Sequence, residues 1–218
     1  MSRIIVFGGH GRIALLLAPL LHARGDEVTA VIRNPEHVAD VEGTGAVAVV
    51  ADVEQLDVAE LAELIRGHDA VVWSAGAGGG SPERTYAVDR DAAIRTMDAA
   101  ASAAVRRYVM VSWIGSTADH GISQDDGFFP YADAKWAADE HLRGTELDGT
   151  ILGPGTLTFD EPTGHIELDP DGRGEVSRAD VAAVILATLQ EPCTIGRTIR
   201  FGNGTTASSQ EIGTALAC

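Results

Sequence analysis

Lysine and cysteine are almost absent from this sequence of 218 residues, which contains one lysine, Lys135, and two cysteines, Cys193 and Cys218. Two cysteines are too few for a disulfide framework or a cysteine metal site. The longest apolar run, IALLLAPLL, contains Pro19 and is shorter than the roughly 20 residues of a membrane-spanning helix. The N-terminus leads directly into an apolar strand, with no room for a signal peptide. We therefore expect a cytoplasmic protein without a membrane partner.

Positive charge is scarce as well, with 16 basic residues against 32 acidic ones and a formal net charge of −16. Such a balance repels polyphosphate backbones, so we expect no direct nucleic-acid partner. The seven histidines lack metal-ligand spacing, so no metal site is predicted. His165 is expected to be an ordinary loop residue. A hydrophobic content of 45% indicates a folded protein. We expect a monomer or a homodimer, and the sequence does not decide between them.

Strand-like and helix-like segments alternate along the chain. We expect strands at 3–7, 27–32, 46–51, 69–75, 106–112, 149–152 and 197–201, and helices at 11–25, 55–67, 82–104, 131–144 and 178–190. Strands rich in Val, Ile and Ala that alternate with helices predict a parallel sheet covered on both faces. Pro19 is expected to bend its helix or to leave a carbonyl unpaired.

The fold class is therefore α/β, a doubly wound parallel sheet of the Rossmann type, in a single domain over residues 1–218. The segment 197–201 is expected to close the sheet. Loops at 113–130 and 153–177 are predicted to lie over its C-terminal edge and to form small substrate-side segments.

A glycine-rich turn follows the first strand, in the sequence FGGHGRIA. Gly8, Gly11 and the small Ala14 have the spacing of a turn that brings backbone N–H groups close to a pyrophosphate. The motif alone is weak evidence, but its position between a strand and a helix strengthens it. We predict that the turn, which includes Gly9, His10 and Ile13, binds a dinucleotide.

The residue after the second strand indicates which dinucleotide is bound. An Asp or Glu there favours NAD, whereas this chain has Arg33. A guanidinium binds a 2′-phosphate, so we predict NADP, with NAD as the other possibility. Arg12 is either a second cation that faces the same phosphate or a surface arginine at a helix start.

Small and polar residues follow the third and fourth strands. Asp52 is placed to accept from the adenine amino group, and Val53 to pack against the ring. Ser74, Ala75 and Gly76 provide flexible backbone beside the adenine ribose. Each feature is common in α/β proteins, but together they lie at successive carboxyl ends of strands on one sheet edge.

Taken in order, the segments GGHGRIA, VIRN, ADV, SAGAG, AVDRDAA with Asp89, VMVS and YADAK resemble the short-chain dehydrogenase/reductase superfamily. The resemblance is greatest to its atypical branch of NmrA-like and flavin-reductase-like proteins, and it covers nearly the whole chain. It implies a Rossmann fold and NAD(P) binding. The branch includes reductases, isomerase-like enzymes and redox-sensing binders, so the resemblance leaves the activity open.

Tyr131 and Lys135 are spaced i, i+4 and are expected on one helix face. Hydride transfer to a carbonyl leaves an alkoxide that needs a proton, and a nearby ammonium is expected to lower the tyrosine pKa. The resemblance implies that Tyr131 is the acid and base, that Lys135 also binds the nicotinamide ribose, and that Ser112 orients the substrate. Ser116 is an alternative to Ser112, and Gly153 replaces an arginine that is common in the branch.

The leading hypothesis is an NADP-dependent oxidoreductase of the short-chain type acting on a small carbonyl, quinone or flavin-like molecule. The first alternative is a non-catalytic NADP-sensing protein that regulates a partner. The second is a sugar-nucleotide epimerase or dehydratase, which usually has a larger C-terminal substrate domain. The predicted cofactor-binding residues are Gly8, Gly9, His10, Gly11, Arg12, Ile13, Arg33, Asp52, Val53, Ser74, Ala75, Gly76 and Lys135.

Overall fold

The computed structural model describes residues 1–79, 81–204 and 210–217, so Cys218 lies outside the described residues. Within them, nine strands form one sheet in the order β11-β8-β10-β6-β5-β4-β1-β2-β3. The parallel strands are β1 (Arg3–Phe7), β2 (Glu27–Ile32), β3 (Val47–Val50), β4 (Ala70–Trp73), β5 (Arg107–Val111), β6 (Asp148–Pro154) and β10 (Thr198–Asn203). The order 3-2-1-4-5-6 confirms the predicted Rossmann fold.

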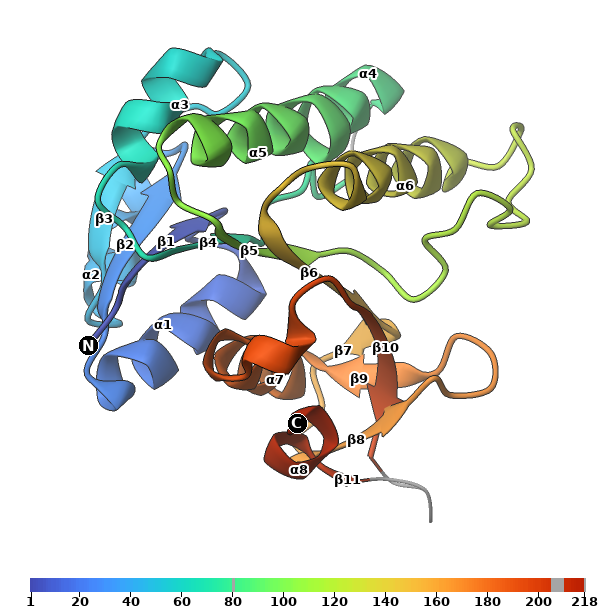
Figure 1. Ribbon diagram of the computed structural model, residues 1–218. Coiled ribbons are helices and arrows are strands. Elements are labelled where there is room, and N and C mark those ends of the chain that lie inside the picture. Colours follow the sequence, from blue (N-terminus) through green and yellow to red (C-terminus); the bar gives the residue numbers. More distant parts are fainter. Residues whose placement is uncertain (80, 205–209, 218) are drawn as a thin grey trace.

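Helices cover both faces of this sheet (Figure 1). On one face lie α3 (Val58–Ile65), α4 (Pro82–Thr85), the π-helical η2 (Tyr86–Ala92), α5 (Ala93–Ser102) and α6 (Phe129–Arg143). On the other lie α1 (Arg12–Arg24), α7 (Arg178–Gln190) and α8 (Ile212–Leu216). Shorter pieces are η1 (Pro35–His37), α2 (Val38–Glu42) and η3 (Pro192–Thr194). The described residues contain no helix that is long and apolar enough to cross a membrane.

The sheet has one hydrophobic core on each face, because successive side chains of a strand point to opposite faces. In β1, Ile4 and Val6 join the cluster under α1 and α7, whereas Ile5 and Phe7 join the cluster under α3 and α5. All four side chains are at most 2% exposed. A strand that is buried on both faces has a continuous run of apolar residues. This run is why β1 could be predicted correctly from the sequence.

Local signals fix several helix ends. Asp57 and Glu60 form a capping box at the start of α3. At the end of α1, Gly25 adopts φ 91°, a left-handed conformation in which its N–H reaches the carbonyls of the last turn. Pro19 does not interrupt α1, which runs from Arg12 to Arg24 as one helix.

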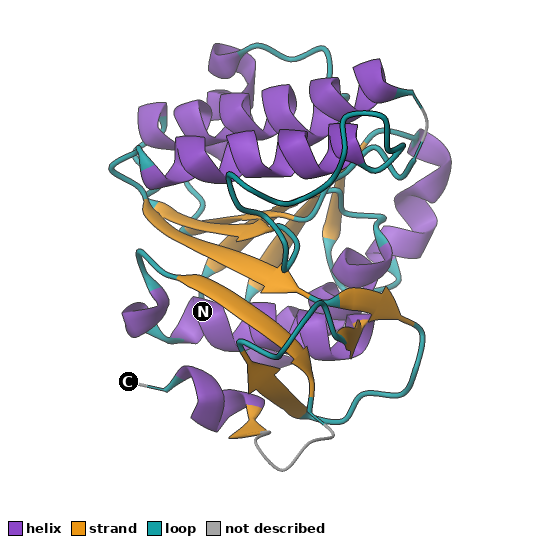
Figure 2. Ribbon diagram, turned by 90° about the vertical axis from the view of Figure 1, so that its right-hand side faces the viewer, coloured by secondary structure: helices purple, strands orange, loops and turns teal. Residues whose placement is uncertain are grey.

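Two expectations about the C-terminal part were wrong. The segment 153–177 contains β7 (Thr156–Thr158), β8 (His165–Leu168) and β9 (Glu175–Ser177) in addition to loops. Moreover, β10 does not close the sheet, because β8 pairs antiparallel with β10, and β11 (Gln210–Glu211) pairs with β8. The small β7-β9 sheet lies beside the carboxyl ends of the parallel strands (Figure 2). The loop at 113–130 is confirmed, except that α6 begins at Phe129.

Candidate functional site

The glycine turn after β1 is pressed against neighbouring backbone. A Cβ on Gly8 would lie 2.6 Å from the Cα of Ala75, and Gly8 has a φ of +81° that other residues rarely adopt. A Cβ on Gly9 would lie 2.6 Å from the Cβ of Ala30. The Gly11 N–H donates to the Gly8 carbonyl at 2.7 Å and closes the turn. The turn therefore requires glycine, as the spacing predicted.

A cavity of about 490 Å³ opens beside this turn, at the carboxyl ends of β1 to β4. Most of the predicted cofactor-binding residues line it, namely Gly8, His10, Gly11, Arg33, Asp52, Val53, Ser74, Ala75 and Gly76. Sequence reasoning missed other lining residues, among them Asn34, His37, Glu54, Ala77, Arg84 and Val88. Four predicted residues do not line this cavity: Gly9, Arg12, Ile13 and Lys135.

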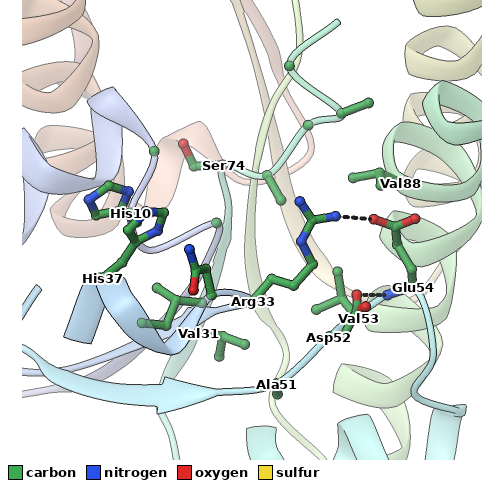
Figure 3. A pocket seen from close by; sticks show the side chains of 18 of the residues that line it. His10, Val31, Arg33, His37, Ala51, Asp52, Val53, Glu54, Ser74 and Val88 are labelled. Carbon is green, nitrogen blue, oxygen red and sulfur yellow. Dashed lines mark hydrogen bonds and ion pairs between the residues drawn. The ribbon is translucent and has the colours of Figure 1, made fainter. Parts of the chain in front are cut away.

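Arg33 extends across the cavity to a carboxylate that the sequence did not single out (Figure 3). Nη1 of Arg33 lies 3.0 Å from Oε1 of Glu54. The same oxygen accepts a hydrogen bond from Nε of Arg84 at 3.3 Å. The Glu54 N–H in turn donates to Asp52 Oδ1 at 3.1 Å. One carboxylate thus holds two guanidinium groups at the cavity wall. In the sequence, the only indication that Glu54 belongs to this site is its position two residues after Asp52.

Two histidines stack at the opposite side of the same cavity (Figure 3). The rings of His10 and His37 have centroids 3.6 Å apart and planes inclined by 15°. Nε2 of His10 lies 3.1 Å from Oδ2 of Asp40 on α2. His10 was predicted from the glycine turn, whereas His37 comes from the short helix η1, which the sequence analysis did not locate.

Arg12 was considered as a second cation for the 2′-phosphate, but it does not line the cavity that contains Arg33. Its guanidinium carbon lies 4.7 Å from the ring centroid of Phe159, on the segment after β7, instead of lining the cavity beside Arg33. Arg178, the first residue of α7, approaches the same ring to 4.1 Å. Arg12 therefore faces the segment after β7, because it stands at the first position of α1 and not in the turn itself.

Lys135 is fully enclosed in α6 and is only 2% exposed. Its Nζ donates to the backbone carbonyl of Val111 at 2.7 Å. Burial lowers the pKa of Lys135, and this shift is opposed by the charges of Asp89 and Asp139. Burial raises the pKa values of Asp89 and Asp139 in turn, and Lys135 opposes the rise. The only lysine of the chain is thus the centre of a buried charged cluster.

Asp139 uses one oxygen to hold both candidate serines. Ser112 and Ser116 each donate their hydroxyl hydrogen to Oδ2 of Asp139 at 2.5 Å, and Ser112 is only 4% exposed. A hydroxyl has one hydrogen, so in this arrangement neither serine has one to give to a substrate carbonyl. Oδ1 of Asp139 is buried without a hydrogen-bond partner among the described residues.

We predicted a lowered pKa for Tyr131, and this prediction is wrong. Burial of the phenol raises its pKa, and the negative charges of Asp89 and Asp139 raise it further. The ammonium of Lys135 was expected to lower it, but these two carboxylates oppose that charge and were not anticipated as neighbours. The phenol of Tyr131 is therefore protonated at neutral pH.

Tyr131 lines a second cavity of about 430 Å³. This cavity shares Gly76, Ala77 and Gly78 with the first, so the two adjoin along the segment after β4. Asp89 also lines it, and Oδ2 of Asp89 accepts the N–H of Ala77 at 2.9 Å. Phe128 packs against Tyr131 with ring centroids 5.1 Å apart. The combined space is long, with a glycine-rich side and an aromatic end.

Arg200 lies beside Gly153, where the resemblance led us to note a missing arginine. The two residues are register partners in β10 and β6. The Arg200 side chain passes 3.5 Å from the position a Cβ on Gly153 would take, and its Nε donates to the Ile114 carbonyl at 3.1 Å. A cation from the neighbouring strand thus holds the start of the loop at 113–130. The pairing of β10 with β6 brings Arg200 next to Gly153, and the sequence alone does not show this.

No group of three or more His, Cys, Asp or Glu side chains in the described part of the chain is arranged to hold a metal ion. The site therefore consists of backbone amides, the Arg33-Glu54-Arg84 cluster, the aromatic residues and the buried Lys135 cluster.

Comparison with known proteins identifies the family. The profile of an NAD(P)H-binding family matches residues 8–192. The uncharacterized sugar epimerase YhfK of Bacillus subtilis is 33% identical over 213 residues, 96% of this chain and 98% of that protein. A putative NAD-dependent epimerase/dehydratase from Bacillus halodurans superposes with a TM-score of 0.89 at 31% identity, covering 99% of each chain. The oxidoreductase ylbE from Lactococcus lactis gives 0.86 at 31% identity, covering 98% and 94%. The chain belongs to the NAD(P)H-binding family of atypical short-chain dehydrogenase/reductases.

Proposed function

We propose that the protein is an NADP-dependent oxidoreductase of the short-chain type that reduces a small carbonyl, quinone or flavin-like molecule. The observation that carries this proposal is the position of Tyr131 in the wall of the second cavity, directly beside the cavity at the glycine turn. A dinucleotide that lies along the first cavity reaches the second through the residues they share, Gly76, Ala77 and Gly78.

The residues fit a dinucleotide. Gly8 and Gly9 have no room for a Cβ, as expected of a turn that packs backbone against a pyrophosphate. Arg33 is 56% exposed at its side chain and can turn from Glu54 to a 2′-phosphate, which supports NADP over NAD. When bound, NADPH supplies a hydride.

Tyr131 then supplies the proton. Its raised pKa keeps the phenol protonated at neutral pH, as a general acid requires. Lys135 lies one helical turn further along α6 and places its ammonium in the same buried region, where positive charge favours the phenolate left after proton transfer. We assign Asp139 the task of holding Ser112 and Ser116, and we leave the orientation of the carbonyl to the walls of the second cavity.

A non-catalytic NADP-sensing protein is the alternative, and one observation favours it. Ser112, the residue expected to orient a substrate, is committed to Asp139 in this structure. Two relatives whose names include an epimerase align with this chain over 98% and 99% of their own length. The chain therefore does not lack a C-terminal part that these relatives have. We therefore keep an epimerase as a third candidate.

Turnover distinguishes these candidates. Purified protein is mixed with NADPH and aldehydes, quinones or flavins, and the loss of NADPH absorbance is followed. We expect turnover with at least one class, and Tyr131→Phe should abolish reduction of carbonyls while it leaves NADPH affinity unchanged. NADPH binding without any turnover, with wild type and Tyr131→Phe indistinguishable, would favour the sensing protein. Interconversion of sugar nucleotides without net NADPH loss would favour the epimerase.

A further inference from the structure

Two arginines from separate elements meet at one exposed aromatic ring. The guanidinium carbons of Arg12 and Arg178 lie 4.7 Å and 4.1 Å from the ring centroid of Phe159, so their separation cannot exceed the sum of these distances. Phe159 is 74% exposed. The arginines open α1 and α7, which lie side by side under the sheet, and Phe159 follows β7 (Figures 1 and 2).

The two arginines lie close to each other and have no counter-ion among the residues that the structure describes. Within the described part of the chain, no ion pair involves Arg12 or Arg178, although the protein carries twice as many acidic as basic residues. The charge of Arg12 also contributes to lowering the pKa of Arg178, after the larger effect of burial. Two guanidinium groups repel each other when they are held together, so their juxtaposition costs free energy unless an anion lies between or beside them.

Hydrogen-bond donors remain at the cluster. Arg178 uses Nη1 for the backbone carbonyls of Leu157 and Thr158, at 3.2 and 2.7 Å. These bonds fix the guanidinium and leave its Nη2 and Nε donors without a partner among the described residues. The Arg12 side chain makes no hydrogen bond within that set. A carboxylate or phosphate accepts from such groups in pairs, and a guanidinium is the group best shaped to bind it.

The cluster lies outside the linings of both cavities, beside the segment after β7 that the sequence predicts to be on the substrate side. Neither Arg12 nor Arg178 lines the cavity that contains Arg33 and Asp52, where the adenine half of a dinucleotide is expected. Both instead face the segment after β7 that brings Phe159 over them. Phe159 adds an exposed apolar face, which suits a ligand with a hydrocarbon or aromatic body next to its charged group.

We propose that Arg12, Arg178 and Phe159 form an anion subsite that selects a substrate carrying a carboxylate or phosphate on an apolar body. This rests on the proposed function, because it assigns the substrate class of the same site. The arginines bind the charged group, Phe159 packs against the body, and the reducible end of the molecule points towards Tyr131.

The test uses two probes that differ in charge and by one methyl group. The purified protein saturated with NADP⁺ is titrated calorimetrically with 4-carboxybenzaldehyde and with its methyl ester, methyl 4-formylbenzoate. We expect the carboxylate to bind roughly tenfold more tightly than the ester. Arg178→Gln and Arg12→Gln should each remove most of this preference. Arg66→Gln is the matched control, since it removes one exposed guanidinium at the end of α3.

Three results would overturn the proposal. The first is equal binding of the two probes, or failure of both to bind, in the wild type. The second is an unchanged preference in Arg178→Gln with a lower melting temperature, which would make the cluster a structural clasp. The third is an equal loss of NADP⁺ and NAD⁺ affinity in Arg178→Gln, which would assign the arginines to the dinucleotide pyrophosphate. None of these measurements requires turnover, so they remain interpretable if the turnover test of the proposed function fails.

Discussion

Arg33 and Glu54 form an ion pair across the cavity beside the glycine turn, with 3.0 Å between Nη1 and Oε1. Arg33 follows β2 and Glu54 follows β3, so the pair joins two neighbouring strands at their carboxyl ends. In the proposed complex with NADPH, a 2′-phosphate competes with Glu54 for this guanidinium. We therefore expect the affinity for NADPH to depend on both residues and not on Arg33 alone.

Replacing Arg33 separates the two dinucleotides. Arg33→Gln should weaken NADPH binding by at least about tenfold, because a charge-assisted pair with the phosphate is lost. NADH affinity should change little. Fluorescence titration with both cofactors measures this, and Arg66→Gln controls for the loss of one positive charge. Equal weakening of NADPH and NADH would show that Arg33 does not read the phosphate.

Replacing Glu54 has the opposite effect. Glu54→Gln keeps the shape of the side chain and removes the charge that holds Arg33 and Arg84. We expect NADPH to bind a few-fold more tightly, since a partly exposed ion pair of this kind is worth about 1 kcal/mol or less. The same titration provides the measurement. Weaker NADPH binding in Glu54→Gln would mean that the carboxylate positions Arg33 for the phosphate.

The glycine turn gives a steric prediction. Gly9→Ala places a Cβ 2.6 Å from that of Ala30, so the turn has to move away from β2. We expect loss of binding to both NADPH and NADH, together with a lower melting temperature. Gly213→Ala in α8 is the control, because its added Cβ would meet no described atom within 4 Å other than those of its chain neighbours and of its own helix backbone. Normal dinucleotide binding by Gly9→Ala would exclude this turn as the pyrophosphate site.

Asp139 makes stability depend on pH with a definite sign. Burial raises its pKa above the ordinary value of 3.8, so the folded state binds more protons than the unfolded state in the window above that value. The free energy of unfolding should therefore fall as the pH rises through this window. The slope for one such group is at most about 1.4 kcal/mol per pH unit.

Asp139→Asn tests this assignment, because the variant cannot titrate at that position. Urea denaturation at a series of pH values should give a wild-type curve that falls more steeply with pH than that of Asp139→Asn. Asp89, whose pKa is also raised, is present in both proteins and titrates in both. A difference between the curves that grows in favour of the wild type as the pH rises would mean that Lys135 holds Asp139 ionised.

Local patterns in the sequence were enough for much of the fold and of the dinucleotide site. The strand at 3–7 and the helix at 178–190 were predicted to the residue. Glycine spacing located a turn whose backbone has no room for other side chains. These features depend on residues close together in the chain, so apolar periodicity and glycine positions reveal them.

The remaining features depend on contacts between distant residues. Strand β8 has only four residues between turns, and it is a strand because Ile166 pairs with Asn203 and is buried under α8. Ser112 meets Asp139 across 27 positions.

The sequence by itself determined the order of the parallel strands and of the main helices between them, the glycine turn and the membership of Tyr131 and Lys135 in one helix. Only the tertiary structure decided what surrounds them. The direction of the Tyr131 pKa depends on burial and on Asp89 and Asp139, which reach it from η2 and from further along α6. Electrostatic energies follow distance and burial in space, and the spacing of residues along the chain does not contain that information.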